Sequence, residues 1–239
     1  MICSTAANLF SLTPGDEVVA IYRISRTISL FASILSGYFI FLTLHEVFEV
    51  DKRWSYFTAL LCILCTVPWY FATRPDSLMA MFLFSSIYFF CRSLKQDSGA
   101  YRYLVASGLA AALSFFSKQN GLIISIIAGS YLLLNLKIKD LGLFIFGFLL
   151  GTTIFLLLFY GFYTKFFFQH LTEGVNNGID IQTAITKVYH TYVSRFGTLT
   201  VITILLALFI ISRMSFRDIS KEFKFLLYAL FVSISFSVA

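Results

Sequence analysis

Two short charged turns interrupt the long apolar runs of this sequence. The first, "FATRPDSLMA" at residues 71–80, contains Arg74 and Asp76, and the second, "FSKQNGL" at residues 116–122, contains Lys118. An arginine guanidinium presents a planar fork of donors that suits phosphate, and a lysine ammonium adds a compact positive charge. Charges held in or beside a membrane usually have a function. These residues therefore predict an anion site with phosphate as its ligand.

A purely structural role explains the same residues. Pro75 suits the first turn of a helix, and Asp76 suits the positive end of the helix dipole. Arg74 can extend its charged head to the membrane interface. Lys118, which precedes Gly121, can likewise simply end a helix. The residues alone leave both interpretations open.

The composition identifies the environment of these turns. Of the 239 residues 59% are hydrophobic and 13% are charged, and the mean hydropathy is +0.85. Soluble domains carry about a quarter charged residues. The chain is therefore predicted to be an integral membrane protein. Its net charge of +6 does not indicate nucleic acid, because no polar segment alternates basic and aromatic residues as single-strand binders do.

Apolar runs of about 17 to 25 residues predict membrane helices, because lipid cannot satisfy an open backbone. We therefore expect an all-α fold, a polytopic transmembrane bundle of about eight helices. The expected helices are 26–44, 57–72, 76–91, 103–117, 120–136, 141–162, 196–212 and 225–239.

The loops between these helices differ in charge. Four connectors on one face hold eleven of the eighteen lysines and arginines: Lys52, Arg53, Arg92, Lys95, Arg102, Lys137, Lys139, Arg213, Arg217, Lys221 and Lys224. The excess of basic residues predicts that this face is cytoplasmic. Arg74, Asp76 and Lys118 then lie together on the opposite, non-cytoplasmic face.

The sequence does not indicate a metal site. Cys62 and Cys65 have the CxxC spacing but lie inside an apolar run, with no second Cys or His pair to complete a tetrahedral site. We expect them to pack in a helix. No cofactor is firmly implied, and a divalent metal is not excluded.

The connector 163–195 is too long to be a simple turn, and such loops often have a function. Its second half fits an amphipathic helix that lies on the bilayer. The polar residues His170, Glu173, Asp180 and His190 could line an acceptor cleft or simply face water.

Three stretches in order resemble a known family: "YRISRTISLFASILSGYFIF" at 22–41, "ATRPDSL" at 72–78 and "SKQNGLI" at 117–123. They resemble the C-type membrane glycosyltransferases that use polyprenyl-phosphate sugars, which include protein mannosyltransferases and aminoarabinose transferases. The resemblance covers residues 10–165.

The resemblance implies a lipid-linked sugar donor and transfer to a lipid, glycan or protein acceptor on the non-cytoplasmic side. It implies that Arg74 and Lys118 contact the donor phosphate and that Asp76 positions the site. It also implies a multi-pass protein of the cell envelope, for which we expect a bacterial inner membrane.

The chain departs from the family at its start. The family's catalytic carboxylate follows an initial membrane helix and acts as general base. Here "VVAIYRIS" at 18–25 matches the start of the second family helix, so we expect a truncated chain that lacks this carboxylate and is inactive as written. Asp16 and Glu17 are the only acidic residues left upstream, and they are the remaining candidates for the base.

These expectations divide the chain into four parts. Residues 1–25 form a non-cytoplasmic segment, 26–162 a core of six helices, 163–195 the long loop, and 196–239 two further helices. A non-catalytic transporter or lipid-binding scaffold is the alternative function. A transporter would favour a repeat of broken helices and mid-membrane charges, and the sequence shows neither. An enzyme like the O-antigen polymerases and ligases is a further alternative.

Overall fold

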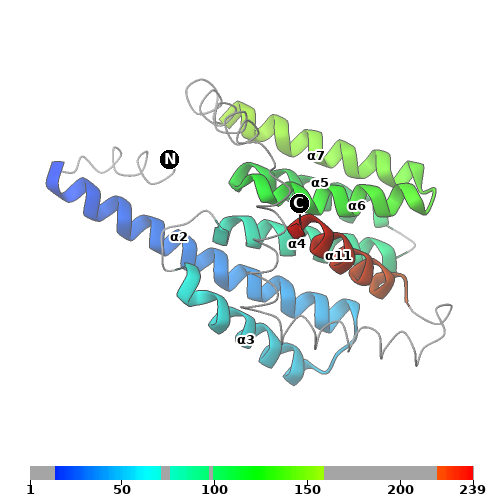
Figure 1. Cartoon of the computed structure of the whole chain (residues 1–239), viewed down its shortest axis with the longest axis horizontal. Helices are drawn as coiled ribbons and strands as arrows, with labels where there is room; N and C mark the ends of the chain where they lie inside the picture. The colour runs from blue at the N-terminus through cyan, green and yellow to red at the C-terminus, as the bar shows by residue number, and fades with distance from the viewer. Residues whose placement is uncertain (1–13, 71–75, 97–98, 159–219, 239) are drawn as a thin grey trace. The chain divides into compact units, whose positions relative to one another are not determined.

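The computed structural model describes residues 14–70, 76–96, 99–158 and 220–238 (Figure 1). The chain divides into two compact units, Met1–Phe166 and Phe167–Ala239. All regular structure of the described residues is helical, which confirms the predicted all-α class. The expected helix at 196–212 lies outside the described residues, so the number of about eight helices stays a prediction.

The described helices follow the apolar runs closely. The first unit contains α2 (Pro14–Leu42), the π-helix η1 (Thr43–Val47), α3 (Lys52–Tyr70), α4 (Asp76–Lys95), α5 (Ala100–Ser117), the 3-10 turn η2 (Gln119–Gly121), α6 (Leu122–Leu134) and α7 (Ile138–Leu158). The second unit contains α11 (Lys221–Val238), where the Ser220 hydroxyl accepts the Phe223 N–H at 3.3 Å.

The start of α2 differs from the expectation. The predicted boundary at residue 26 is wrong for the helix, which already begins at Pro14. Hydropathy detects where a helix enters lipid, not where it begins, and the apolar span within α2 starts at Tyr22. Proline and acidic residues such as Asp16 are favourable in a first helical turn.

Three described helical segments are long and apolar enough to cross a membrane: Tyr22–Val47, Asp76–Lys95 and Ile138–Leu158. The shorter apolar helix Leu122–Leu134 has 13 residues, about 20 Å at 1.5 Å per residue. Exposed leucine, isoleucine and phenylalanine side chains cover α2, α3 and α7, as expected where lipid replaces water. The protein is a membrane protein.

Serine hydroxyls join α4 to α5 in an antiparallel pair. Ser86 and Ser107 are fully buried, and each hydroxyl donates to the other residue's backbone carbonyl at 2.9 Å. Further along the same interface the Ser114 hydroxyl donates to the Met79 carbonyl at 3.1 Å. Hydrogen bonds between helices hold membrane bundles together where the hydrophobic effect cannot.

Glycines let α5 and α7 approach closely. A Cβ on Gly108 would lie 2.1 Å from the Phe144 carbonyl oxygen, and one on Gly147 would lie 2.1 Å from that of Val105. Any larger residue would push the two backbones apart. Gly147 and Gly151 form a GxxxG pair, the spacing that favours such contact between membrane helices.

The helix directions define two ends of the first unit. The rings of Phe39 and Phe89 lie 5.9 Å apart, and Lys95 contacts the backbone of Glu46, so α2 and α4 run parallel. Arg92 and Lys95 therefore share one end with the C-terminus of α2, which we call the Arg92 end. Asp76 and Lys118 mark the opposite Lys118 end, where α4 begins and α5 finishes.

Candidate functional site at the Lys118 end

The structure brings two of the predicted site residues together. The Lys118 ammonium donates to Oδ1 of Asp76 and forms an ion pair with it. The two side chains are 39% and 25% exposed respectively, so the pair is accessible. Asp76 stands in the first turn of α4 and Lys118 directly follows α5. Each charge thus also opposes the dipole of its own helix end.

The local sequence explains why α5 ends at Lys118. Its backbone is extended at φ −160° and ψ 141°, while its N–H still bonds to the Ser114 carbonyl at 3.1 Å. Gly121 then donates its N–H to the Lys118 carbonyl at 2.8 Å. A Cβ at Gly121 would lie 2.2 Å from the Ser114 oxygen. The turn therefore folds back tightly enough to require glycine.

Other predicted site residues are placed less closely or not at all. Arg74 lies outside the described residues, as do the four candidate residues of the 163–195 connector, His170, Glu173, Asp180 and His190. Asp16 and Glu17 belong to the first turn of α2. From the pairing of Phe39 with Phe89, Asp76 is level with Arg26 and Thr27, so the backbone of Asp16 lies about 15 Å further along the axis. In Figure 1 the start of α2 extends past its neighbours.

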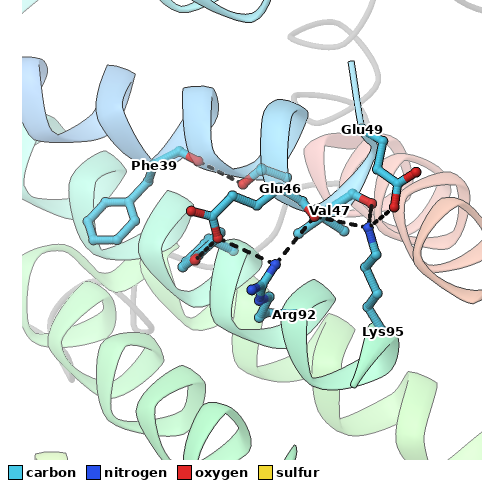
Figure 2. A network of polar contacts seen from close by, with 8 residues as sticks. Phe39, Glu46, Val47, Glu49, Arg92 and Lys95 are labelled. Carbon is cyan, nitrogen blue, oxygen red and sulfur yellow. Dashed lines mark hydrogen bonds and ion pairs between the residues drawn. The ribbon is translucent and has the colours of Figure 1, made fainter. Parts of the chain in front are cut away.

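The Arg92 end holds a denser polar network that the sequence reading missed (Figure 2). The Glu46 carboxylate accepts the Tyr88 hydroxyl at 2.8 Å and lies 3.4 Å from Nη1 of Arg92. The same guanidinium nitrogen donates to the Glu46 carbonyl at 3.3 Å. Arg92 thus ties α4 to the last turn of the α2–η1 helix.

Lys95 completes this network. Its ammonium donates to the carbonyls of Glu46 and Val47, each at 3.0 Å, and to the Glu49 carboxylate at 2.6 Å. The carbonyls at a helix C-terminus have no partners within the helix, so a lysine there satisfies them and opposes the dipole. The hydrogen bond and the charge of Lys95 lower the pKa of the Glu49 carboxyl.

One signal for this network was present in the sequence. "HEVFEV" at 45–50 places two carboxylates after the first apolar run, and "CRSLK" at 91–95 places two cations after the third. The π-helix at Thr43–Val47 and the positive φ of 56° at Glu49 had no such signal in the sequence.

Within the described ranges, no group of three or more His, Cys, Asp and Glu side chains could hold a metal ion. The expectation that no metal is indicated therefore stays a prediction, since the long connector is outside these ranges.

The comparisons with known proteins give one finding. A family model described as dolichyl-phosphate-mannose-protein mannosyltransferase matches residues 10–163, which include both the Lys118 end and the Arg92 end. This confirms the family resemblance drawn from the charged turns. No curated protein and no solved structure matches the chain.

Proposed function

Because the chain belongs to the dolichyl-phosphate-mannose-protein mannosyltransferase family of membrane glycosyltransferases, we propose that it handles a sugar linked to a polyprenyl phosphate. In this proposal the Lys118 end binds the donor phosphate, and the sugar passes to an acceptor on the non-cytoplasmic side. The ion pair of Lys118 with Asp76 across the ends of α4 and α5 is the observation that supports it most.

The exposure of Lys118 suits a phosphate ligand. An ammonium has three donor hydrogens, and the carboxylate of Asp76 takes one of them. The others can reach a phosphate, because the side chain is 39% exposed. Asp76 then holds the ammonium in place. Arg74, two residues earlier in the sequence, adds a second cation, so the three residues carry a net charge of +1.

The position of the site at a helix end also suits a lipid carrier. The 20 residues of α4 span about 30 Å, the thickness of the hydrocarbon layer. A phosphate bound at its first residue stays at the headgroup level, while the polyprenyl chain contacts lipid. A charge-assisted hydrogen bond there is stronger than in bulk water, because the local dielectric is lower.

The charge at the two ends supports the proposed side. Within the described residues, the Arg92 end has seven basic residues in or beside its turns: Lys52, Arg53, Arg92, Lys95, Arg102, Lys137 and Lys139. By the positive-inside rule this end faces the cytoplasm. The donor site at the Lys118 end then faces the opposite side, in a multi-pass arrangement.

The transfer also needs a general base for the acceptor hydroxyl. Asp16 and Glu17 stay candidates, but their backbone lies about 15 Å beyond the level of Asp76 along α2, given 1.5 Å per residue. A base must come within hydrogen-bond reach of the acceptor hydroxyl. Asp16 and Glu17 could therefore act as the base only for an acceptor hydroxyl held far from the donor phosphate, toward the start of α2.

Titration with dolichyl phosphate in nanodiscs tests the site, with dolichol as the ligand that lacks the phosphate. Lys118→Ala should weaken dolichyl phosphate binding about tenfold or more, the scale of one lost hydrogen bond to a charged group. Arg74→Ala should act similarly, with Arg74→Lys as a partial rescue. Binding of dolichol should not change.

Lys139→Ala is the matched control. It removes an exposed lysine at the Arg92 end and should leave both affinities unaltered. Unchanged affinity for dolichyl phosphate in both Lys118→Ala and Arg74→Ala, with the variants folded, would exclude the phosphate site.

A further inference from the structure

We propose that Ser114 is a positioning residue, which fixes Lys118 against Asp76 and so sets the affinity for the donor phosphate. This inference rests on the proposed function of the Lys118 end. It assigns a role to a buried serine that makes no contact with the phosphate itself.

Ser114 connects the two helices that carry the ion pair. Its side chain is fully buried, and its hydroxyl donates to the carbonyl of Met79 at 3.1 Å. Met79 lies three residues after Asp76, in the first turn of α4. The carbonyl of the same serine accepts the N–H of Lys118 at 3.1 Å. One residue therefore holds the start of α4 and the end of α5 together.

The turn after Lys118 also packs on Ser114. The nearest atoms to a Cβ built on Gly121 are the Ser114 carbonyl oxygen at 2.2 Å, its carbon at 2.4 Å and its Oγ at 2.6 Å. Gly121 also donates its N–H to the Lys118 carbonyl. The backbone on both sides of Lys118 thus contacts Ser114, and from this turn the lysine side chain reaches Asp76.

This arrangement matters because Lys118 is long and flexible. A lysine side chain loses rotamer entropy when it is held in one place. Asp76 holds the ammonium only if the ends of α4 and α5 keep their separation. Binding sites need such support to within about 0.5 Å. Without the Ser114 hydroxyl the two ends can separate, and the ammonium moves away from the phosphate position.

Ser107 provides the matched control. It is also fully buried in the α4–α5 interface and donates to a carbonyl of α4, that of Ser86, at 2.9 Å. It stands seven residues from Ser114, about 10 Å along the helix. Ser107→Ala and Ser114→Ala remove the same kind of bond from the same interface. Of these two bonds, only that of the Ser114 hydroxyl lies beside Lys118.

The experiment measures the affinity of nanodisc-embedded protein for dolichyl phosphate and for dolichol, together with the unfolding midpoint. Ser114→Ala should weaken dolichyl phosphate binding about fivefold, the scale of one hydrogen bond, and leave dolichol binding unchanged. Ser107→Ala should lower the unfolding midpoint similarly and leave both affinities unchanged. Gly121→Ala should weaken dolichyl phosphate binding too, whereas Gly129→Ala, whose nearest neighbour would lie at 3.9 Å, should not.

A double-mutant cycle with Lys118→Ala separates this inference from the proposed function. If Ser114 acts through Lys118, Ser114→Ala should have no further effect on affinity in the Lys118→Ala background. An equal effect in both backgrounds, or no effect of Ser114→Ala while Lys118→Ala weakens binding, would overturn the positioning role and leave the phosphate site standing. Normal affinity in Lys118→Ala would overturn the positioning role, and together with normal affinity in Arg74→Ala it would exclude the phosphate site as well.

Discussion

The two ends of α4 carry charges of both signs but use them differently. At the Arg92 end two cations meet two carboxylates, and the cations also bond to backbone carbonyls of Glu46 and Val47. At the Lys118 end one described cation meets one carboxylate, and the sequence adds Arg74 nearby. Within the network of the Arg92 end each cation has a carboxylate partner, whereas at the Lys118 end Arg74 adds a cation beyond the pair of Lys118 and Asp76.

This difference separates a structural cluster from a candidate binding site. The Lys95 ammonium donates to two carbonyls and a carboxylate, and Nη1 of Arg92 faces the carbonyl and carboxylate of Glu46, so both cations are directed at protein groups. Lys118 has one carboxylate partner among the described residues, and its side chain is 39% exposed. Cations with unused hydrogen bonds at a membrane interface are suited to phosphate. We therefore expect changes at the Arg92 end to reduce stability and changes at the Lys118 end to reduce donor affinity.

Arg92→Ala should give the largest loss of stability. It removes the guanidinium from the Glu46 carboxylate and carbonyl in a half-buried site, which should cost about 1.5 to 3 kcal/mol. Affinity for dolichyl phosphate should stay normal. Equilibrium unfolding in detergent and the nanodisc titration measure the two effects.

Arg102→Ala is the control for this variant. Its guanidinium is exposed and bonds to the neighbouring Tyr101 hydroxyl at 3.0 Å, so its loss should be near neutral. Equal destabilisation by Arg92→Ala and Arg102→Ala would show that Arg92, with its partners in the network, contributes no more stability than an exposed arginine does.

Asp76→Asn should have a smaller effect on stability, below about 1 kcal/mol, because its ion pair with Lys118 is partly exposed to screening. The asparagine keeps one oxygen that can accept from the ammonium. The same unfolding measurement compares it directly with Arg92→Ala. A loss as large as that of Arg92→Ala would mean that the Lys118 end is also a structural cluster, and the contrast between the ends would disappear.

The smallest expected effect is a pH dependence at Glu49. Lys95 lowers the pKa of its carboxyl below the ordinary value of 4.5. The stabilisation is therefore present above that value and is lost as the pH falls through the lowered pKa. Wild type should exceed Glu49→Gln slightly in unfolding midpoint near neutral pH, and the two should converge in acid. A constant difference across this range would show that the Glu49 charge is not the cause.

The sequence predicted much of the fold because lipid imposes a strong pattern. Apolar length located the described helices to within a few residues at most ends, and the turn residues around Asp76 and Lys118 located the candidate site. The early start of α2 at Pro14 was missed because a helix outside lipid needs no apolar run. The GxxxG pair of Gly147 and Gly151 is visible in the sequence, but the pattern does not identify the helix that it contacts.

The sequence by itself determined the helical class, the family resemblance and which residues can carry charge to the membrane surface, since these depend on composition and local order. The tertiary structure alone decided which charges meet. It paired Lys118 with Asp76, although 42 residues separate them, and it placed Arg92 and Lys95 of α4 against the last turn of the α2–η1 helix. Such partners depend on the direction and register of packed helices. The close contact at Gly108 and the hydrogen bonds of Ser107 and Ser114 set that register. These contacts join residues far apart in the sequence, so no local sequence pattern predicts them.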